Sequence, residues 1–299
     1  MEFRQVQYFV CLFEEGSVTR AARRLNIVQP ALSMQVAKLE EELGRRLFVR
    51  SKQGMEPTAE GRQMYRLFLP ILGDFARARD QMMQSDGALS GSVRIGTVAT
   101  IAQGVMVDAL REFSQTHPQV VLSVTDGYSA TLADAVAGGQ LDAAIINKPR
   151  RPLALNTEPI AEEELLLITG PQHAPLGDTV RFRQLPKLKL KLVLPTRQHG
   201  LRGIIESFAQ TEDVHLAPAL EIDSISAIVK LVLESDFATL LPRTAVSRQL
   251  DQGVLRKHEV LSPRLTRQLV SITHPRRPLS PAASAFIAVL LRHVRGIGR

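Results

Sequence analysis

Residues 16–33 read GSVTRAARRLNIVQPALS, and this stretch decides the fold of the N-terminal part of the chain. Gly16 breaks a helix, and the hydroxyl of Ser17 can accept a hydrogen bond from a free backbone N–H, so a short helix is expected to follow. Asn26 tolerates the left-handed conformation in which helices often end. Pro30 suits the first turn of the next helix. The stretch therefore predicts two helices joined by a tight turn, as in a helix-turn-helix.

Apolar residues on both sides of this stretch recur at helical spacing. Before it they are Val6, Phe9, Val10 and Phe13, and after it they are Leu32, Val36, Leu39 and Leu43. The opposite face of the third helix is small, polar and basic, with Pro30, Ser33, Met34, Ala37 and Lys38. Such a face suits insertion into a DNA major groove. An ordinary three-helix bundle with a solvated face fits the same periodicity equally well.

A short hairpin is predicted directly after the third helix. Leu47–Arg50 is expected to form its first strand, Ser51–Gly54 its turn and Met55–Pro57 its return. Arg50 and Lys52 would lie at its tip, where a wing touches phosphates or the minor groove. Residues 1–66 hold eleven Lys and Arg against eight Asp and Glu, so the arrangement of these elements, and not the net charge, favours DNA binding.

The helices and the hairpin together resemble the LysR-type transcriptional regulators. The matching pattern is Ala21-Ala22, Leu25, Gln29-Pro30-Ala31-Leu32-Ser33, Leu39-Glu40, Leu43-Gly44, Leu47-Phe48 and Arg50. The resemblance implies base contacts by Gln29, Pro30 and Ser33 and wing contacts around Arg50 to Gln53. Many relatives carry a basic or amide residue where this chain has Met34, so a contact with a thymine methyl is expected there instead. The expected DNA-binding set is Gln29, Pro30, Ser33, Met34, Lys38, Arg50 and Lys52.

A long helix is expected from Thr58, its cap, to about Gln84. Its apolar stripe consists of Met64, Leu67, Phe68, Ile71, Leu72 and Phe75, and must be buried against something. Pro70 predicts a kink. The resemblance implies that this helix pairs two chains and so presents two readers to a two-fold symmetric site. Ser85–Ser92 is small and flexible in composition and predicts a hinge.

The remaining two-thirds of the chain alternate between strand and helix patterns. Strands are expected at 93–96, 120–125 and 141–146, with helices around 106–113 and 132–137 between them, which predicts a parallel sheet with covering helices. Later apolar runs, at 165–168, 191–194, 220–222, 237–241 and 269–273, fit two α/β subdomains that share a cleft. The looser resemblance here implies a periplasmic-binding-protein-like effector domain, whose chain crosses over near Ala161 and returns near Arg267.

The expected fold class is thus an N-terminal α domain, the winged helix-turn-helix, followed by an α/β effector domain of two subdomains. The expected boundaries are 1–58 for the winged helix-turn-helix, 59–91 for the linker helix and hinge, and 92–299 for the effector domain. Subdomain I is expected at 92–161 and 267–299, and subdomain II at 162–266.

Polar side chains follow three of the predicted strands, where ligands bind in open α/β sheets. They are Thr97 and Thr100 after the first strand, Asn147 and Lys148 after the third, and Thr196, Arg197, His199 and Arg202 after the strand that ends at Leu194. Helix N-termini and cations favour a small carboxylate or another anion. The alternative is that each hydroxyl only caps a helix and each cation is solvated.

The composition limits the classes of protein that fit. With 299 residues, 44% hydrophobic and 22% charged, the chain has material for two or three globular domains. A net charge of +7 weakly favours a polyanionic partner. Cys11, the single cysteine, lies in an apolar stretch and predicts a buried structural thiol. The seven histidines lack ligand-like spacing, so no metal and no other resident cofactor is expected.

Several other classes of protein are disfavoured. The N-terminus has no basic segment leading into an apolar run, and no apolar stretch approaches the roughly 18 residues of a spanning helix, so we expect a cytoplasmic protein without a membrane partner. The phosphate-binding loop, the dinucleotide glycine pattern and the nucleophile elbow are absent, which argues against an enzyme. A solute-binding transport protein would fit the C-terminal part but would need an export signal.

The sequence thus predicts a transcriptional activator or repressor controlled by a small anionic co-inducer bound between two subdomains. The expected partners are double-stranded DNA with an inverted repeat, the effector, and further copies of the chain in a dimer or homotetramer, with RNA polymerase as another candidate. A constitutive DNA-binding protein that ignores small molecules is the alternative, and only ligand binding separates the two.

Overall fold

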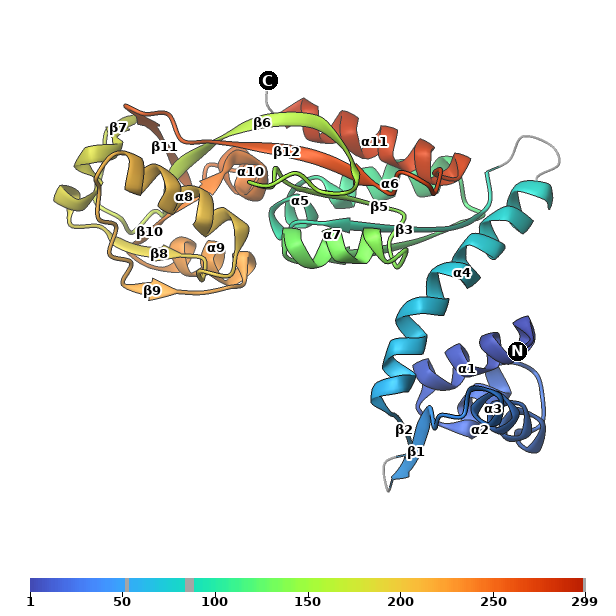
Figure 1. Ribbon diagram of the computed structural model, residues 1–299. Coiled ribbons are helices and arrows are strands. Elements are labelled where there is room, and N and C mark those ends of the chain that lie inside the picture. The colour runs from blue at the N-terminus through green and yellow to red at the C-terminus, as the bar shows by residue number, and fades with distance from the viewer. Residues whose placement is uncertain (52–53, 84–88, 298–299) are drawn as a thin grey trace. The chain divides into compact units, whose positions relative to one another are not determined.

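The computed structural model describes residues 1–51, 54–83 and 89–297 of the chain (Figure 1). Two compact units are present. The first ends at Met83, and the second contains every helix and strand from Gly91 onward.

The first unit is a three-helix bundle followed by a hairpin and a long helix. Its elements are α1 (Phe3–Glu15), α2 (Val18–Arg24), α3 (Gln29–Leu43), β1 (Phe48–Ser51), β2 (Gly54–Pro57) and α4 (Ala59–Met83). The predicted stripe of α3 is confirmed at Leu32, Val36 and Leu39, which are buried. It is wrong at Leu43, which is 40% exposed because it is the last helical residue before Gly44 and lies beyond the core. Cys11 is buried, as expected.

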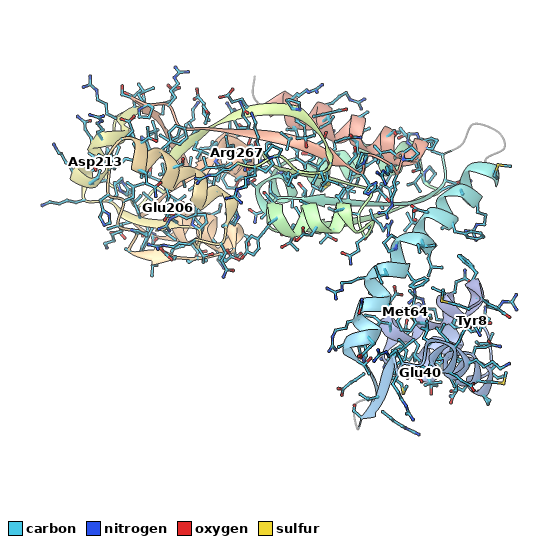
Figure 2. All side chains as sticks on the ribbon, in the orientation of Figure 1. Tyr8, Glu40, Met64, Glu206, Asp213 and Arg267 are labelled. Carbon is cyan, nitrogen blue, oxygen red and sulfur yellow. The ribbon has the colours of Figure 1, made fainter. Side chains whose placement is uncertain are left out.

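The long helix α4 begins where Thr58 accepts a hydrogen bond from the Gly61 N–H at 3.0 Å, which confirms the predicted cap. The helix continues without interruption through Pro70. Met64 is buried in the same core as Tyr8 of α1 (Figure 2). Farther along the apolar stripe, Leu67, Ile71 and Phe75 are each more than half exposed in the single chain. The predicted hinge lies mostly outside the described residues, since 84–88 are not described.

The second unit is built on one mixed sheet with strand order β4-β3-β5-β12-β6-β10-β8-β9. Subdomain I holds β3 (Gly91–Thr97), β4 (Val120–Asp126) and β5 (Ala143–Asn147), which run parallel as predicted, and β12 (Thr266–Thr273), which is antiparallel to β5. Its helices are α5 (Ala99–Gly104), α6 (Met106–Thr116), α7 (Ser129–Ala137) and α11 (Pro281–Ile297).

Every residue of β5 is buried, because the sheet is covered on both faces. Ala143 and Ile145 belong to the core shared with α6 and α11, whereas Ala144 and Ile146 belong to the core shared with α7. This alternation explains why the sequence there is a continuous apolar run.

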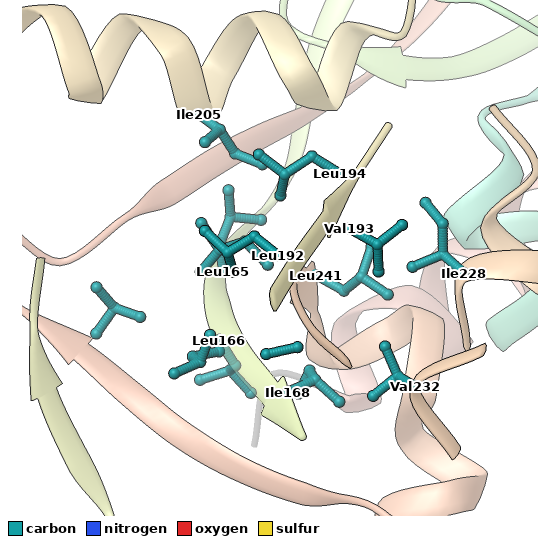
Figure 3. Packing of buried hydrophobic residues seen from close by; sticks show 14 of the residues in the cluster. Leu165, Leu166, Ile168, Leu192, Val193, Leu194, Ile205, Ile228, Val232 and Leu241 are labelled. Atoms are coloured by element: carbon teal, nitrogen blue, oxygen red, sulfur yellow. The ribbon is translucent and has the colours of Figure 1, made fainter. Parts of the chain in front are cut away.

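Subdomain II has its own core around β8 (Lys191–Leu194) and β10 (Phe237–Pro242). Leu192, Val193 and Leu241 pack there with side chains of α8 (Gly200–Thr211) and α9 (Ile225–Glu234) (Figure 3). The other elements are β7 (Thr179–Arg181), the 3-10 helix η1 (Phe182–Leu188), β9 (Leu220–Glu221), α10 (Arg243–Asp251) and β11 (Arg256–Leu261). Because β7 and β11 pair only with distant segments, the sequence pattern gave no signal for them.

The strand β6 (Asn156–Thr169) belongs to both subdomains. Its residues 156–164 pair with β12 of subdomain I, and Leu165–Thr169 pair with β10 of subdomain II, both antiparallel. Leu165–Ile168 also supply side chains to the core of subdomain II. A single continuous strand therefore joins the two subdomains at residues 164 and 165.

Candidate DNA interface and effector site

The turn between α2 and α3 has the geometry that its sequence predicts. Gly16 and Asn26 both adopt positive φ, 58° and 53°, and Ser17 accepts a hydrogen bond from the Arg20 N–H. The amide nitrogen of Gln29, the first residue of α3, donates to Thr19 Oγ1 of α2 at 2.9 Å. This bond fixes the orientation of the Gln29 side chain relative to both helices.

The outward face of α3 is open to solvent. Its exposed residues are Gln29, Pro30, Ser33, Met34, Ala37 and Lys38. Met34 is 50% exposed and presents an apolar surface on this face. Every predicted base-contacting residue thus lies on one accessible side of the helix.

The wing is the hairpin of β1 and β2, in which Arg50 pairs with Met55. Arg50 is exposed near the end of β1, one residue before Ser51, and Lys52 lies outside the described residues. The Met55 N–H donates to the Gly16 carbonyl at 2.8 Å, which ties the wing to the turn before α2. A Cβ at Gly54 would lie 2.4 Å from the Gly16 oxygen, and Gly54 has φ +130°, so this approach requires glycine.

The α3 helix also positions the base of the wing, through a residue to which we assigned no role from the sequence. Glu40 lies along the groove on the same side of the helix as Gln29 and Ser33. Its Oε1 accepts hydrogen bonds from the N–H groups of Leu47 at 2.6 Å and Phe48 at 3.0 Å (Figure 2). The motif contains a glutamate at this position, but the sequence could not show that its partners are backbone groups of the following strand.

A groove of about 640 Å³ separates the reading face of α3 from the wing. Its lining includes Ser17, Thr19, Gln29, Ser33, Arg50 and Ser51. Nearby Arg20 and Arg24 pair with the carboxylates of Glu14 and Glu15, whereas Arg50 lies exposed beside the groove. Hydrogen-bonding side chains and a cation along one groove suit a nucleic-acid backbone and base edges.

In the second unit, two of the predicted effector residues, Thr100 and Asn147, lie together beside Arg267, which was not among the predicted effector residues. Arg267, fully buried on β12, donates from Nη1 to Thr100 Oγ1 at 2.8 Å and to Asn147 Oδ1 at 3.3 Å (Figure 2). Thr100 lies within α5 instead of preceding a helix, and Asn147 is the last residue of β5. Thr97, the last residue of β3, is also buried, and its hydroxyl lies 3.5 Å from the Val98 carbonyl oxygen.

Arg267 is paired with a carboxylate from the opposite strand. Glu163 of β6 lies directly across from Arg267, and its Oε2 is 2.7 Å from Nε and 2.5 Å from Nη2 of the guanidinium. Thr244 of α10 donates its hydroxyl to Oε1 of the same carboxylate. This pair could not be predicted from the sequence, because Glu163 stands in the run Glu162-Glu163-Glu164, which looks like a solvated charged surface.

Thr196 and His199 belong to a contact between the subdomains. Thr196 and Tyr128 both donate hydroxyl hydrogen bonds to Asp223, and Tyr128 follows β4 whereas Asp223 precedes α9. The hydrogen bond from Tyr128, with further contributions from Thr196 and His199, lowers the pKa of Asp223. Burial lowers the pKa of His199, whose Nδ1 accepts from the Leu201 N–H and caps α8.

The other three predicted effector residues lie apart from this group. Lys148 is exposed and donates to Gln268 Oε1 at 2.8 Å. Arg197 and Arg202 line a separate pocket of about 420 Å³ on α8. Arg202 is buried there and pairs with Glu206 at 2.9 Å and Glu221 at 3.0 Å. The buried cation beside Thr100 is thus Arg267, and not one of the arginines that we expected from the sequence.

The described residues contain neither a candidate membrane-spanning helix nor a candidate metal cluster. Across 1–51, 54–83 and 89–297, none of the helices has the length and apolar character needed to cross a membrane. Within the same part of the chain, no three His, Cys, Asp or Glu side chains are grouped so that they could hold a metal ion.

Comparison with known proteins agrees with these two units. The family described as "LysR substrate binding domain" matches residues 86–295, and the one described as "Bacterial regulatory helix-turn-helix protein, lysR family" matches residues 3–62. The nitrogen assimilation regulatory protein nac of Escherichia coli is 29% identical over 293 residues, which cover 97% of this chain and 94% of that protein. The probable RuBisCO transcriptional regulator of Cyanidioschyzon merolae is 29% identical and covers 96% of each chain.

Solved structures share the fold over the whole chain. A full-length OxyR variant from Pseudomonas aeruginosa has a TM-score of 0.75 at 25% identity and covers 99% of this chain and 95% of its own. Full-length CbnR complexed with its target DNA has a TM-score of 0.71 at 21% identity and covers 98% of this chain and 100% of its own. The predicted fold class is confirmed, and since these relatives are regulators, so is the expectation of a protein that is not an enzyme. The chain therefore belongs to the LysR family of DNA-binding transcriptional regulators, with an N-terminal helix-turn-helix and a C-terminal effector-binding domain.

Proposed function

We propose that the protein reads its operator by inserting α3 into the major groove while the wing contacts the adjoining backbone. The observation that carries this proposal is the exposed face of α3, with Gln29, Ser33 and Met34, beside a groove bounded by Arg50. The solved complex of CbnR with its target DNA, which has the same fold, supports this use of the N-terminal unit. Pro30 and Lys38 share the face, and Lys52 belongs to the proposed wing contacts although it lies outside the described residues.

Gln29 is the best candidate for reading a base. A side-chain amide has two N–H donors and a carbonyl acceptor, so after its bond to Thr19 it retains a donor and an acceptor. That pair matches the N7 and N6 edge of adenine. Met34 offers an apolar surface to a thymine methyl, and Ser33 can donate or accept.

The protein binds as a dimer or a dimer of dimers through α4 in this proposal. The exposed side chains of Leu67, Ile71 and Phe75 support it, because an apolar stripe of this kind is unfavourable in water. Two paired readers match an inverted repeat. In this proposal the winged helix-turn-helix covers 1–58, the linker helix and hinge 59–91, subdomain I 92–161 and 267–299, and subdomain II 162–266. RNA polymerase is a further partner when the protein activates transcription.

The effector is a small anion bound between the subdomains, next to Thr100 and Asn147. The buried guanidinium of Arg267 supports an anionic ligand. We place Thr196 and His199 of subdomain II on the facing side of the site, because Gly200, which follows His199, packs against the Asn147 amide. A ligand that binds one arrangement of the subdomains better than another shifts the regulator between states.

A mobility-shift assay with the DNA upstream of the protein's own gene tests the reader. Wild type is compared with Gln29→Ala and Ser33→Ala at fixed salt, with Gln63→Ala, on the exposed side of α4, as the control. Each base-contact variant is expected to lose about 1–3 kcal/mol of specific binding. Unchanged binding by both variants would show that α3 is not the reader.

A further inference from the structure

The guanidinium of Arg267 is neutralised by a residue of the chain itself. Its Nε and Nη2 lie 2.7 and 2.5 Å from Oε2 of Glu163, while Nη1 serves Thr100 and Asn147. Among the described residues, Glu163 is the carboxylate that pairs with Arg267. The pairing is incomplete, because Nη2 has no hydrogen-bond partner among the described residues although it lies close to Oε2. A carboxylate that accepted hydrogen bonds from both Nε and Nη2 would therefore bind this cation more fully than Glu163 does.

The donors around that carboxylate form a receptor for a carboxylate group. One edge of a guanidinium faces Oε2, and the Thr244 hydroxyl donates to Oε1. The side chains of Arg267 and Glu163 are 0% and 8% exposed, so these interactions are made away from bulk water, where an unpaired charge is strongly unfavourable. If the Glu163 carboxylate were removed, the site would require another anion.

This carboxylate also lies where the subdomains are joined. Glu163 is two residues before Leu165, at which β6 begins to pair with subdomain II, and Thr244 lies at the start of α10 in that subdomain. Thr100, Asn147 and Arg267 belong to subdomain I. A change of partner at Arg267 would thus break a link between the two subdomains.

We propose that Glu163 is an internal substitute for the effector, and that a small monocarboxylate regulates the protein by replacing the Glu163 side chain at Arg267 and Thr244. The proposal rests on the effector site put forward above and adds the ligand class and the group that the ligand displaces. In the ligand-free protein, Glu163 holds β6, β12 and α10 together. When the effector carboxylate takes its place, β6 is released at the junction and the subdomains move relative to each other.

Chemical rescue with acetate tests the proposal on the full-length protein. Glu163→Ala removes the carboxylate, and Glu164→Ala removes its half-exposed neighbour, which pairs with Arg264, as the matched control. Melting temperatures are measured at pH 7.5 in sodium acetate and in sodium chloride at equal ionic strength. The Glu163→Ala protein is expected to gain about 4 °C or more from acetate along a saturating curve. Wild type and Glu164→Ala, in which the Glu163 side chain competes with acetate, should gain less than Glu163→Ala does, and an equal gain by all three proteins would overturn the proposal.

A second readout separates regulation from a structural ion pair. The footprint of Glu163→Ala on its upstream DNA is expected to change length or intensity when acetate is added, while that of Glu164→Ala does not. Rescue of the melting temperature without a change in footprint would make Glu163 a structural counter-ion and would overturn the proposal. If wild type does not bind its upstream DNA at all, that result contradicts the proposed reader, and the melting experiment still tests the proposal for Glu163.

A folding defect does not block the test. If Glu163→Ala is soluble only in acetate, that result supports the receptor. If it is insoluble in both salts, Glu163→Gln replaces it, since the amide keeps an acceptor for Thr244 and removes the charge. A greater stabilisation of Glu163→Gln by acetate than of wild type supports the proposal, and equal stabilisation contradicts it.

Discussion

Glu40 links the reading helix to the wing from the side of α3 that it shares with Gln29 and Ser33 along the groove. One oxygen of its carboxylate accepts the backbone N–H groups of both Leu47 and Phe48, two residues whose side chains are buried. Without that oxygen, two backbone donors at the start of β1 lose their partner. This carboxylate therefore helps to set the direction of the wing relative to α3, together with the bond from the Met55 N–H to the Gly16 carbonyl.

Glu40→Ala is expected to destabilise the N-terminal unit by about 1–3 kcal/mol, because hydrogen-bond donors in a partly buried place are left unpaired. DNA binding should weaken as well, because the wing loses two hydrogen bonds that hold it to α3. Urea unfolding and the mobility-shift assay measure the two effects. Glu41→Ala, which changes the exposed neighbouring carboxylate, is the control, and equal effects of the two substitutions would contradict the assigned role.

His199 makes the stability of the effector unit depend on pH. Burial, aided by the charge of Arg267 and opposed by Asp223, lowers its pKa below the value of about 6.5 in an unfolded chain. Between these two pKa values the unfolded chain binds a proton and the folded protein does not, so stability falls as the pH drops below about 6.5. The lowered pKa of Asp223 acts in a separate range, since its contribution is lost only below about pH 4.

His199→Asn is expected to flatten the loss of stability between about pH 7 and 5. Asparagine can accept the hydrogen bond from the Leu201 N–H that caps α8, so the helix start is preserved. The urea midpoint measured across this pH range, in comparison with wild type, checks the prediction. Parallel curves for the two proteins would show that His199 is not the titrating group.

At the level of single residues, local chemistry was predictable and long-range pairing was not. Ser17, Asn26 and Thr58 could be assigned as caps and stops because their partners are within a few residues. Arg267 and Glu163 are 104 residues apart, and nothing near either one marks it as buried. For the same reason the expected cations Arg197 and Arg202, which follow β8 in sequence, turned out to line a different pocket.

At the level of elements, α4 shows one stripe with two different environments. Met64 is buried within its own unit, whereas Leu67, Ile71 and Phe75 are each more than half exposed. The sequence predicts the stripe but does not distinguish the part that is buried in its own unit from the part that stays exposed, such as Leu67 and Ile71. The exposed part begins where α4 extends beyond the helices of the N-terminal bundle, and the position of that point depends on the three-dimensional fold.

Ile71→Glu is expected to shift the protein towards monomer, because a charge would have to be buried in the proposed pairing of two α4 helices. Sedimentation velocity measures the change in mass, and Gln63→Glu adds the same charge at an exposed polar position of the helix as the control. An unchanged mass for Ile71→Glu would mean that the copies associate through another surface.

The prediction of elements succeeded where burial leaves a continuous or periodic signal. The run 141–146 was expected as a strand, and β5 is buried at every position. By contrast, β7 has three residues and β11 shows no apolar alternation, and both depend on pairing partners far along the chain. The leucine-rich strand β6 was expected only over 165–168, because its first half carries the charged residues Glu158, Glu162, Glu163 and Glu164.

For the whole molecule, the net charge of +7 matters less than the position of the cations. Arg50 is exposed beside the groove, whereas Arg20 and Arg24 are paired with carboxylates of the same unit. Phosphate contacts release counterions, so the operator affinity should fall steeply as salt rises.

Arg50→Ala is expected to weaken binding to specific and random DNA alike and to reduce the slope of log affinity against log salt by about one. Titrations at several salt concentrations measure the slope. Arg24→Ala, which removes an arginine already paired with Glu14, should leave the slope nearly unchanged. A change confined to the specific operator would instead assign Arg50 to base reading.

The position of β12 in the sheet has a consequence for how the protein is made. This strand, near the end of the chain, lies between β5 and β6, both of which leave the ribosome about a hundred residues earlier. The reader is complete once α4 has been translated, but the sheet of the sensor stays open until Thr266–Thr273 arrives. A nascent or prematurely terminated chain therefore carries a complete helix-turn-helix unit without a complete sheet in its effector-binding domain.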